Sequence, residues 1–199
     1  MRRLQLVVAA AALLAGAGVA KAGNRLMEAN TPVQVASGAF SVTPPQAWNK
    51  LGARPGRGAE VWTLDGPPLN EITFYGAIQN DQPIFRDRNR RERPLPHFSS
   101  TMLLTDIPTL LENSYRVGRS VAIYNLDRME PARFGGRDGV RFEYSFTEDD
   151  VRRRGEGYGA VVNGRLYLIT FEAPVIHYFD ASIEAFRQLV GHTTIGGRR

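Results

Sequence analysis

Apolar residues fill both faces of one stretch of the chain, and the rest of the predicted fold is arranged around it. This stretch, residues 158–173, has the sequence YGAVVNGRLYLITFEA. Asn163 and Gly164 both accept a positive φ, so they suit the two-residue turn of a β-hairpin. Such a turn places Ala160 opposite Tyr167. The strand after the turn is apolar on both faces apart from one threonine, which predicts a central strand that is covered on both sides.

Alternating apolar and polar residues predict the neighbouring strands. Between the strands expected at residues 33–42 and 60–64, residues 46–49 are expected to form a turn or a short helix that places Trp48 against the core. The strand before the Asn-Gly turn carries glycine at positions 155, 157 and 159. One face of that strand is therefore bare, which favours close packing of backbone or aromatic rings on it. The further strands are expected at residues 33–42, 60–64, 71–77, 120–124 and 140–146.

Two segments repeat apolar residues at the spacing of an amphipathic helix. The first runs to Gly118, with Thr105 as the expected N-cap. The second contains Phe179, Ile183 and Phe186 on one face and ends at Gly191. A helix with one apolar face can cover a sheet. The predicted fold class is therefore α+β, with a twisted antiparallel β-sheet flanked by helices.

The amino terminus has the pattern of an export signal. Two arginines follow Met1, residues 4–20 are apolar apart from Gln5, and Ala20-Lys21-Ala22 fits the small-x-small rule for cleavage before Gly23. The alternative is an uncleaved membrane anchor, for which a stretch of 17 residues is at the short end. We predict a signal peptide at 1–22, a flexible mature amino terminus at 23–32, a single α/β domain at 33–195 and a disordered tail at 196–199. The expected location is the periplasm or the exterior.

Composition narrows the classes of partner. The chain has 199 residues, no cysteine and a formal net charge of +5, so disulfides, thiolate metal sites and a cysteine-linked lipid anchor are excluded. Three of its 25 basic residues, Arg2, Arg3 and Lys21, lie in the first 22 positions, which leaves 22 basic residues against 20 acidic ones. A nucleic-acid-binding protein concentrates positive charge on one face. The near balance of charge argues against a nucleic-acid partner.

Positive charge does gather in one long segment without periodicity, residues 79–100. Loops of this length in compact domains tend to be functional or disordered, and arginine forks bind carboxylates or phosphates in a bidentate manner. The alternative is a solvated loop whose charges pair locally. A second loop, residues 52–58 (GARPGRG), could cradle an anion or be a solvated turn, and it lacks the lysine and helix of a P-loop. The candidate partner-binding residues are Arg86, Arg88, Arg90, Arg91 and Arg93.

No motif in the chain predicts catalysis, a cofactor or a metal ion. Residues 155–160 satisfy G-x-G-x-x-A, but they lead into a strand rather than a helix, so a dinucleotide site is rejected. The acidic run at 148–150 lacks calcium-loop spacing, and local ion pairing with the arginines at 152–154 explains it better. There is no G-x-S-x-G or H-E-x-x-H sequence. The histidines available as bases are His97, His177 and His192.

In the order of its elements, the chain resembles the PsbP-like group of small exported proteins, which includes the bacterial DcrB-type proteins. The resemblance implies a PsbP-like α/β/α sandwich and a non-catalytic role in binding or assembly. It carries over no catalytic residues, and the arginine-rich loop is not part of the family pattern. Four stretches carry the resemblance: FSVTPPQAWN (40–49), GVRFEYSF (139–146), GAVVNGRLYLITFEAP (159–174) and HYFDASIEAFRQLV (177–190).

These observations favour a non-enzymatic exported domain that binds a protein or another envelope component. The missing catalytic constellation and the exposed arginines support this interpretation. Contact with a membrane is expected only through residues 1–22, if they stay uncleaved. The alternatives are a carrier of a small ligand and a hydrolase without a recognisable motif, since paired carboxylates need no sequence signature.

Overall fold

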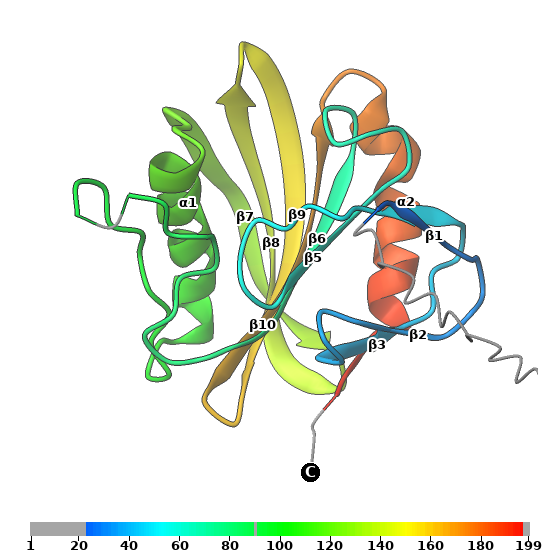
Figure 1. The fold of residues 1–199 in the computed structure, drawn as a ribbon, viewed down its shortest axis with the longest axis horizontal. Helices are drawn as coiled ribbons and strands as arrows, with labels where there is room; N and C mark the ends of the chain where they lie inside the picture. Colours follow the sequence, from blue (N-terminus) through cyan, green and yellow to red (C-terminus); the bar gives the residue numbers. More distant parts are fainter. Residues whose placement is uncertain (1–22, 90, 197–199) are drawn as a thin grey trace, which may run out of the picture.

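The computed structural model describes residues 23–89 and 91–196. The predicted signal peptide, Arg90 and the last three residues lie outside this part of the chain. Within it, one antiparallel sheet of eight strands dominates the fold (Figure 1). From one edge to the other, the strands are β1 (Arg25–Met27), β4 (Trp48–Lys50), β5 (Ala59–Thr63), β6 (Glu71–Ile78), β10 (Arg165–Pro174), β9 (Val151–Val162), β8 (Arg137–Glu148) and β7 (Ile123–Phe134).

The Asn-Gly hairpin forms the centre of this sheet, as predicted. Val162 pairs with Arg165, Ala160 with Tyr167 and Tyr158 with Ile169. Asn163 and Gly164 have φ values of 51° and 69°, as a type I′ turn requires. Strand β10 then pairs with β6 on its other side, and Leu168 and Ile169 are fully buried on opposite faces. The prediction of a central strand covered on both faces is confirmed.

Aromatic rings occupy the bare face that glycine leaves on β9. The rings of Tyr144 and Phe142 on β8 lie over Gly155 and Gly157. A Cβ atom at Gly155 would lie only 2.1 Å from Cζ of Tyr144, far inside van der Waals contact. The expected close aromatic packing is confirmed, and it explains why these positions of the strand carry no side chain.

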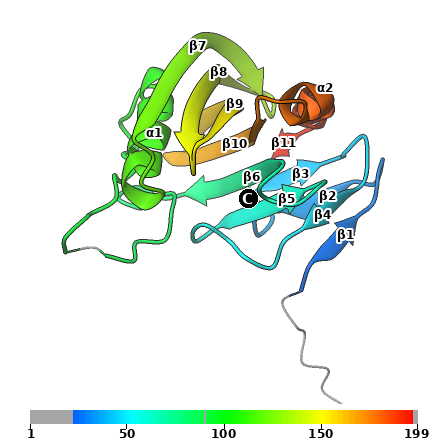
Figure 2. The same ribbon diagram turned by 90° about the horizontal axis from the view of Figure 1, so that it is seen from above.

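Each face of the large sheet has a different cover (Figures 1 and 2). Helix α1 (Ile107–Gly118), which follows the 3₁₀ turn Leu104–Asp106, packs one face. The other face is covered by α2 (Tyr178–Gly191) and by a separate three-stranded sheet. The antiparallel sheet with two helices is confirmed, but the α/β/α sandwich is only partly correct, because a small sheet shares the second face with α2. The strands of the small sheet are β11 (Thr194–Ile195), β3 (Phe40–Val42) and β2 (Val33–Val35).

The amino-terminal part differs from the sequence prediction. Residues 33–42 form two short antiparallel strands instead of one, because the chain reverses at Ala36 and Ser37, both at positive φ. Ser37 and Gly38, which also has a positive φ, form a dipeptide typical of turns, so the sequence did contain a local signal for this reversal. Trp48 is fully buried as expected, but it begins strand β4 rather than a turn or helix. The segment at 23–32 contains strand β1, which pairs with β4 and buries Met27.

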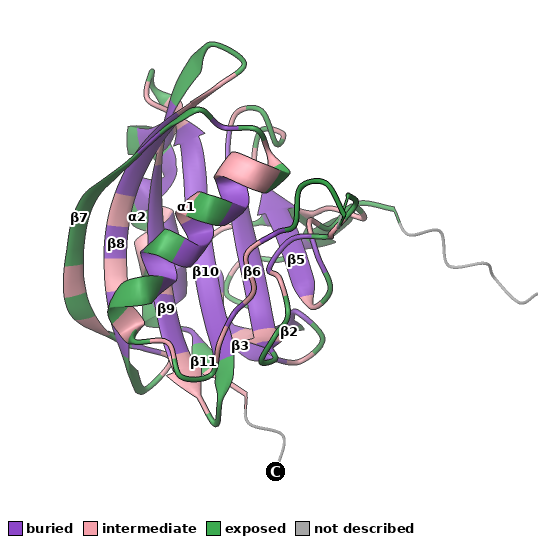
Figure 3. Ribbon diagram, turned by 90° about the vertical axis from the view of Figure 1, so that its left-hand side faces the viewer, coloured by how far each residue is buried: buried purple, intermediate pink, exposed green. Residues whose placement is uncertain are grey.

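Two further element boundaries were predicted wrongly. The strand expected at 120–124 is instead β7, which runs for 12 residues at the sheet edge. Most of its residues are exposed, so it has no period of two to detect (Figure 3). The N-cap position of α1 is Asp106 rather than Thr105, which lies in the preceding 3₁₀ turn.

Candidate functional site

The two loops that sequence analysis singled out lie against each other. The backbone N–H of Arg86 donates a 2.6 Å hydrogen bond to the carbonyl oxygen of Pro55. A Cβ atom at Gly56 would lie 2.2 Å from the carbonyl oxygen of Ile84, so glycine allows the two backbones to approach this closely. Loop 52–58 and the start of the arginine-rich loop therefore form one packed unit, although about 30 residues separate them in sequence.

A cavity of about 1030 Å³ lies between these loops. Four arginines line it, and two come from each loop: Arg54, Arg57, Arg86 and Arg88. On its wall, Nδ1 of His97 lies 2.8 Å from Oδ1 of Asp81. We call this space the outer cavity. Guanidinium groups converging from two loops can bind an anion with fork geometry.

The four arginines of the outer cavity are exposed and, among the described residues, have no carboxylate within ion-pair distance. The structure thus brings together Arg86 and Arg88 with two arginines that the candidate set did not include. Arg91 and Arg93 are also exposed, as predicted, but neither lines the outer cavity. Whether these residues bind a partner stays a prediction.

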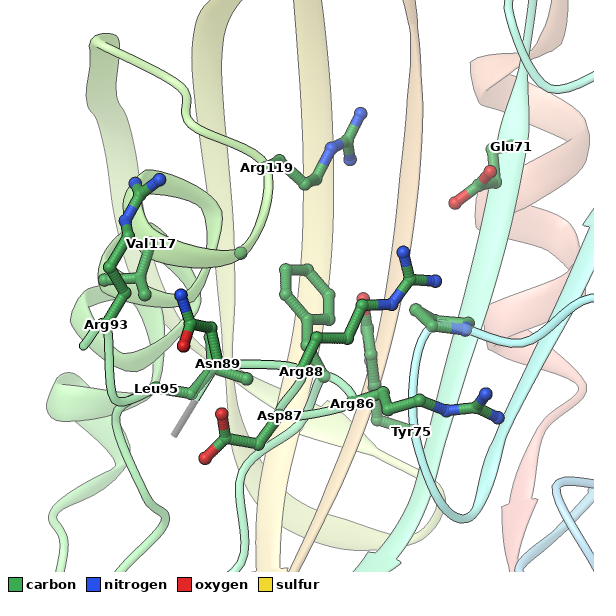
Figure 4. Close-up of a pocket in the computed structure, with 13 residues that line it drawn as sticks. Glu71, Tyr75, Arg86, Asp87, Arg88, Asn89, Arg93, Leu95, Val117 and Arg119 are labelled. Atoms are coloured by element: carbon green, nitrogen blue, oxygen red, sulfur yellow. The ribbon is translucent and has the colours of Figure 1, made fainter. Parts of the chain in front are cut away.

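A second cavity, of about 480 Å³, lies on the α1 side of the same loop (Figure 4). We call it the inner cavity. Tyr75, Phe85, Leu95 and Val117 form its apolar wall. In Figure 4, the guanidinium group of Arg88 and the carboxyl group of Glu71 on β6 are directed toward each other from opposite sides of the space. The charged and polar groups of its lining are Glu71, Arg86, Asp87, Arg88, Asn89, Arg93 and Arg119.

A buried charge network supports the end of the inner cavity. Nη1 of Arg119 donates to Oε1 of Glu172 at 2.8 Å, and its other nitrogens donate to both carboxylate oxygens of Glu148. The hydroxyl of Tyr115 donates to Oε2 of Glu172 at 2.5 Å. Burial acts to lower the pKa of Arg119, but Glu172 and the other anionic partners outweigh it and raise that pKa. Arg119 therefore stays charged and is held in place.

No described arginine binds the carboxyl group of Glu71 directly. It lies opposite Glu172 in the β6–β10 register and accepts a 2.8 Å hydrogen bond from the hydroxyl of Thr73. Burial, followed by the charge of Glu172, raises the pKa of Glu71 to about 7. Its protonation state therefore changes near neutral pH. A perturbed carboxyl group in a cavity marks a candidate site.

The other candidates from the sequence, the charged run at 148–154 and the histidines at 177 and 192, lie in places that the structure now defines. Glu148 binds Arg119 rather than the arginines at 152–154, so the predicted local ion pairing was wrong there. Arg153 instead donates to the carbonyl oxygen of Pro68 and approaches Glu172. His177 and His192 lie at the two ends of α2. Among the described residues, no group of three His, Cys, Asp or Glu side chains could hold a metal ion.

In sequence, the chain matches no protein-family model and no curated protein. In structure, it is similar to PsbP from the cyanobacterium Synechocystis, with a TM-score of 0.52 and 12% identity over 90% of this chain and 96% of that protein. The chain has a PsbP-like fold. A protein from Bacteroides thetaiotaomicron gives the same TM-score at 10% identity over 86% of this chain, which spans 50% of that protein. Identities this low establish the fold alone.

Sequence analysis missed the groups behind the PsbP-like sheet that shape the inner cavity. Glu71 and Arg119 belong to no motif, and each follows a turn or a helix end where charged residues are common. The available signal was the β6–β10 pairing, which places Glu71 beside Glu172. That pairing joins segments about 100 residues apart, so no local pattern contains it.

In the described part of the chain, no helix is long and apolar enough to cross a membrane.

Proposed function

We propose that this protein is an exported, non-enzymatic binding domain whose outer cavity contacts an acidic protein of the cell envelope. The observation that carries the proposal is the set of four exposed arginines that converge on one cavity from two loops, without carboxylate partners among the described residues. An exposed cluster of like charge attracts anionic surfaces, and the attraction weakens as salt rises.

The geometry of the loops supports a prepared surface rather than a solvated connection. The hydrogen bond from Arg86 to Pro55 and the close contact at Gly56 hold the two loops together before any partner arrives. A partner that binds such a surface has less conformational freedom to remove than one that binds a free loop. The PsbP-like sheet is the support that presents this surface.

Capture of envelope proteins by the purified protein tests the proposal with two matched variants. The first replaces Arg54, Arg57, Arg86 and Arg88 with glutamine. The second replaces four exposed arginines elsewhere that also have no ion pair among the described residues: Arg25, Arg137, Arg152 and Arg165. Both variants lose four positive charges, so they differ only in where the charge is removed.

We expect the first variant to lose capture, and the wild type to lose it as salt rises, while the second variant keeps it. Equal loss of capture in both variants would mean that net charge alone causes the attraction. No loss of capture in either variant would place the contact elsewhere. Protease treatment of the extract should abolish capture, because the proposed partner is a protein. Export is tested by amino-terminal sequencing of protein from the cell envelope, with Gly23 as the expected first residue.

A further inference from the structure

The inner cavity differs from the outer one in having an apolar body and a charged end. Tyr75, Phe85 and Leu95 are buried residues whose side chains contribute its wall. Its volume of about 480 Å³ falls in the range of small-molecule sites, which is roughly 300–1,000 Å³. Such sites combine apolar walls with a few polar groups that fix the orientation of the ligand.

The charged end of the inner cavity has positive groups to spare. Arg119 is already bound to Glu148 and Glu172, so its charge is matched by the protein. Arg86 and Arg88 have no ion pair among the described residues, and both line the inner cavity. Glu71 faces Arg88 across the space (Figure 4). The unmatched charge of the cavity therefore favours an anion, with Glu71 as the group that decides how well it is accepted.

We propose that the inner cavity binds a small organic anion with an aromatic or branched apolar body, and that the anionic group lies between the guanidinium group of Arg88 and the carboxyl group of Glu71. In this arrangement Arg88 supplies charge and Glu71 donates a hydrogen bond. The apolar body covers the wall at Tyr75, Phe85 and Leu95. Arg86 and Arg88 line both cavities, so the two proposed sites share these residues. The sites remain separable because Arg54 and Arg57 line the outer cavity and not the inner one, whereas Glu71 lines the inner cavity and not the outer one.

The surroundings of Glu71 explain how its carboxyl group carries a proton near neutral pH. Glu172 on β10 lies opposite it, and the hydroxyl of Thr73 on β6 is its hydrogen-bond partner. Burial and the charge of Glu172 favour the neutral form of Glu71, while the hydroxyl of Thr73 and the charges of Arg119 and Arg153 favour its ionised form. The balance leaves the pKa of Glu71 at about 7. The other titratable or charged groups around this end are Tyr75, Asp87, Arg88, Tyr115, Arg119, Tyr144, Glu148 and Arg153.

This arrangement gives ligand binding a definite pH dependence. An anion next to ionised Glu71 is repelled, and the same anion next to neutral Glu71 accepts a hydrogen bond. Affinity should therefore be highest below the pKa of Glu71 and fall as pH rises through it. With that pKa at about 7, the apparent dissociation constant should rise about tenfold between about pH 6 and about pH 8.

Benzenesulfonate is a suitable probe, because its sulfonate keeps one charge across this range and its ring supplies an apolar body. Benzenesulfonamide is the neutral control of nearly the same shape. Amide chemical shifts of the folded full chain locate each compound, and titrations at three pH values give dissociation constants. We expect benzenesulfonate to shift amides at Tyr75, Val117 and Gly118, and benzenesulfonamide to bind much more weakly.

Three variants separate the roles of the residues. Glu71→Gln should remove the pH dependence and keep the affinity that the wild type has at low pH, since the amide also donates a hydrogen bond. Arg88→Gln should weaken binding about tenfold or more at every pH, because a charge-assisted bond is lost. The double variant Arg54→Gln with Arg57→Gln is the matched control and should bind the probe as the wild type does.

The proposal is overturned if wild-type affinity is independent of pH, if benzenesulfonamide binds equally well, or if the double variant alone loses the probe. The first two results come from the wild type, so they stand even if Glu71→Gln fails to fold. Failure of envelope capture together with pH-dependent probe binding would reject the protein partner and leave the inner cavity in place. Successful envelope capture without pH-dependent probe binding would reject the ligand site in the inner cavity and leave the protein partner in place.

Discussion

Arginines that bind a buried carboxylate of the sheet and arginines of the two loops have different roles in this protein. On β9, Glu156 is fully buried and is bound by Arg141 of β8 and by Arg187 of α2, each at 2.8 Å. Burial acts to raise the pKa of Glu156, but the hydrogen bonds from these arginines outweigh it and lower that pKa. An ionised carboxylate out of water requires such partners. Arg141 and Arg187 are therefore part of the fold.

The loop arginines have no such role. Arg54, Arg57, Arg86 and Arg88 are exposed, and no described carboxylate pairs with them. Folding does not require their charge, so it remains available to a ligand or a partner. Glu71 is intermediate between these two groups of charges. Its carboxyl group is partly buried and accepts a hydrogen bond from Thr73, and no described arginine binds it directly. The comparison teaches that the pairing of a charge, rather than its type, separates structural from candidate binding residues.

The largest expected effect on stability comes from removing an arginine that binds the buried carboxylate of Glu156. Arg141→Met leaves buried Glu156 with Arg187 as its one arginine partner among the described residues, beside the hydroxyl of Tyr158. It also removes one of the two arginine partners of Glu130 and of Glu143. The free energy of unfolding should fall by about 3 kcal/mol, the low end for breaking a buried ion pair, because Arg187 remains. Chemical denaturation measures it.

Arg133→Met is the control for that experiment. Arg133 pairs with Asp138 on an exposed hairpin, so its removal should cost less than about 1 kcal/mol. Equal losses in Arg141→Met and Arg133→Met would mean that burial does not decide the value of these pairs.

The next effect concerns Glu71 and depends on pH. Because its pKa in the folded protein is raised to about 7, its contribution to stability is fully present below its unfolded pKa of about 4.3 and is lost as pH rises toward 7. Glu71→Gln does not titrate. The variant should match the wild type near about pH 4.5 and exceed it by about 2 kcal/mol above pH 7, a value reduced because the side chain is only partly buried.

Thermal or chemical unfolding across this pH range measures the difference between wild type and Glu71→Gln. A difference that shrinks with rising pH would have the opposite sign and would show that Glu71 is stabilised in its ionised form, as the paired sheet carboxylates are.

The smallest global effect is expected from Gly56→Ala. The added methyl group would meet the carbonyl oxygen of Ile84, so the two loops should separate locally while the sheet stays intact. The amide of Arg86, which donates to Pro55, should exchange hydrogen much faster. Unfolding free energy should change by less than about 1 kcal/mol, since loops open independently of the core.

Gly191→Ala serves as the control for Gly56→Ala, because nothing lies within 4 Å of a Cβ atom there. It should leave exchange at Arg86 unchanged. A loss of global stability above about 2 kcal/mol in Gly56→Ala would place the loops in the same cooperative unit as the sheet, against the comparison.

About half of the candidate site was predictable from sequence. The exposure of the arginine-rich loop followed from composition, because an unpaired charge is costly to bury. The loop at 52–58 was recognised as a possible anion cradle. Their contact was not predictable, since it depends on a backbone hydrogen bond between Pro55 and Arg86. The predicted cluster also divides, because Arg91 lines neither cavity.

The sequence by itself determined the elements whose signals are local. The Asn163-Gly164 turn fixed the register of β9 and β10, the alternation in β8 fixed its buried face, and the glycines of β9 fixed where the aromatic rings pack. Turn chemistry and a period of two act over a few residues, so a single sequence contains them.

Only the tertiary structure decided which distant segments meet. The order of strands in the sheet places Glu71 on β6 beside Glu172 on β10, and the end of α1 brings Arg119 to that carboxylate. A raised pKa, an unpaired guanidinium group and a cavity are properties of neighbours in space. They arise from pairings between segments tens of residues apart, which no local pattern of the chain specifies.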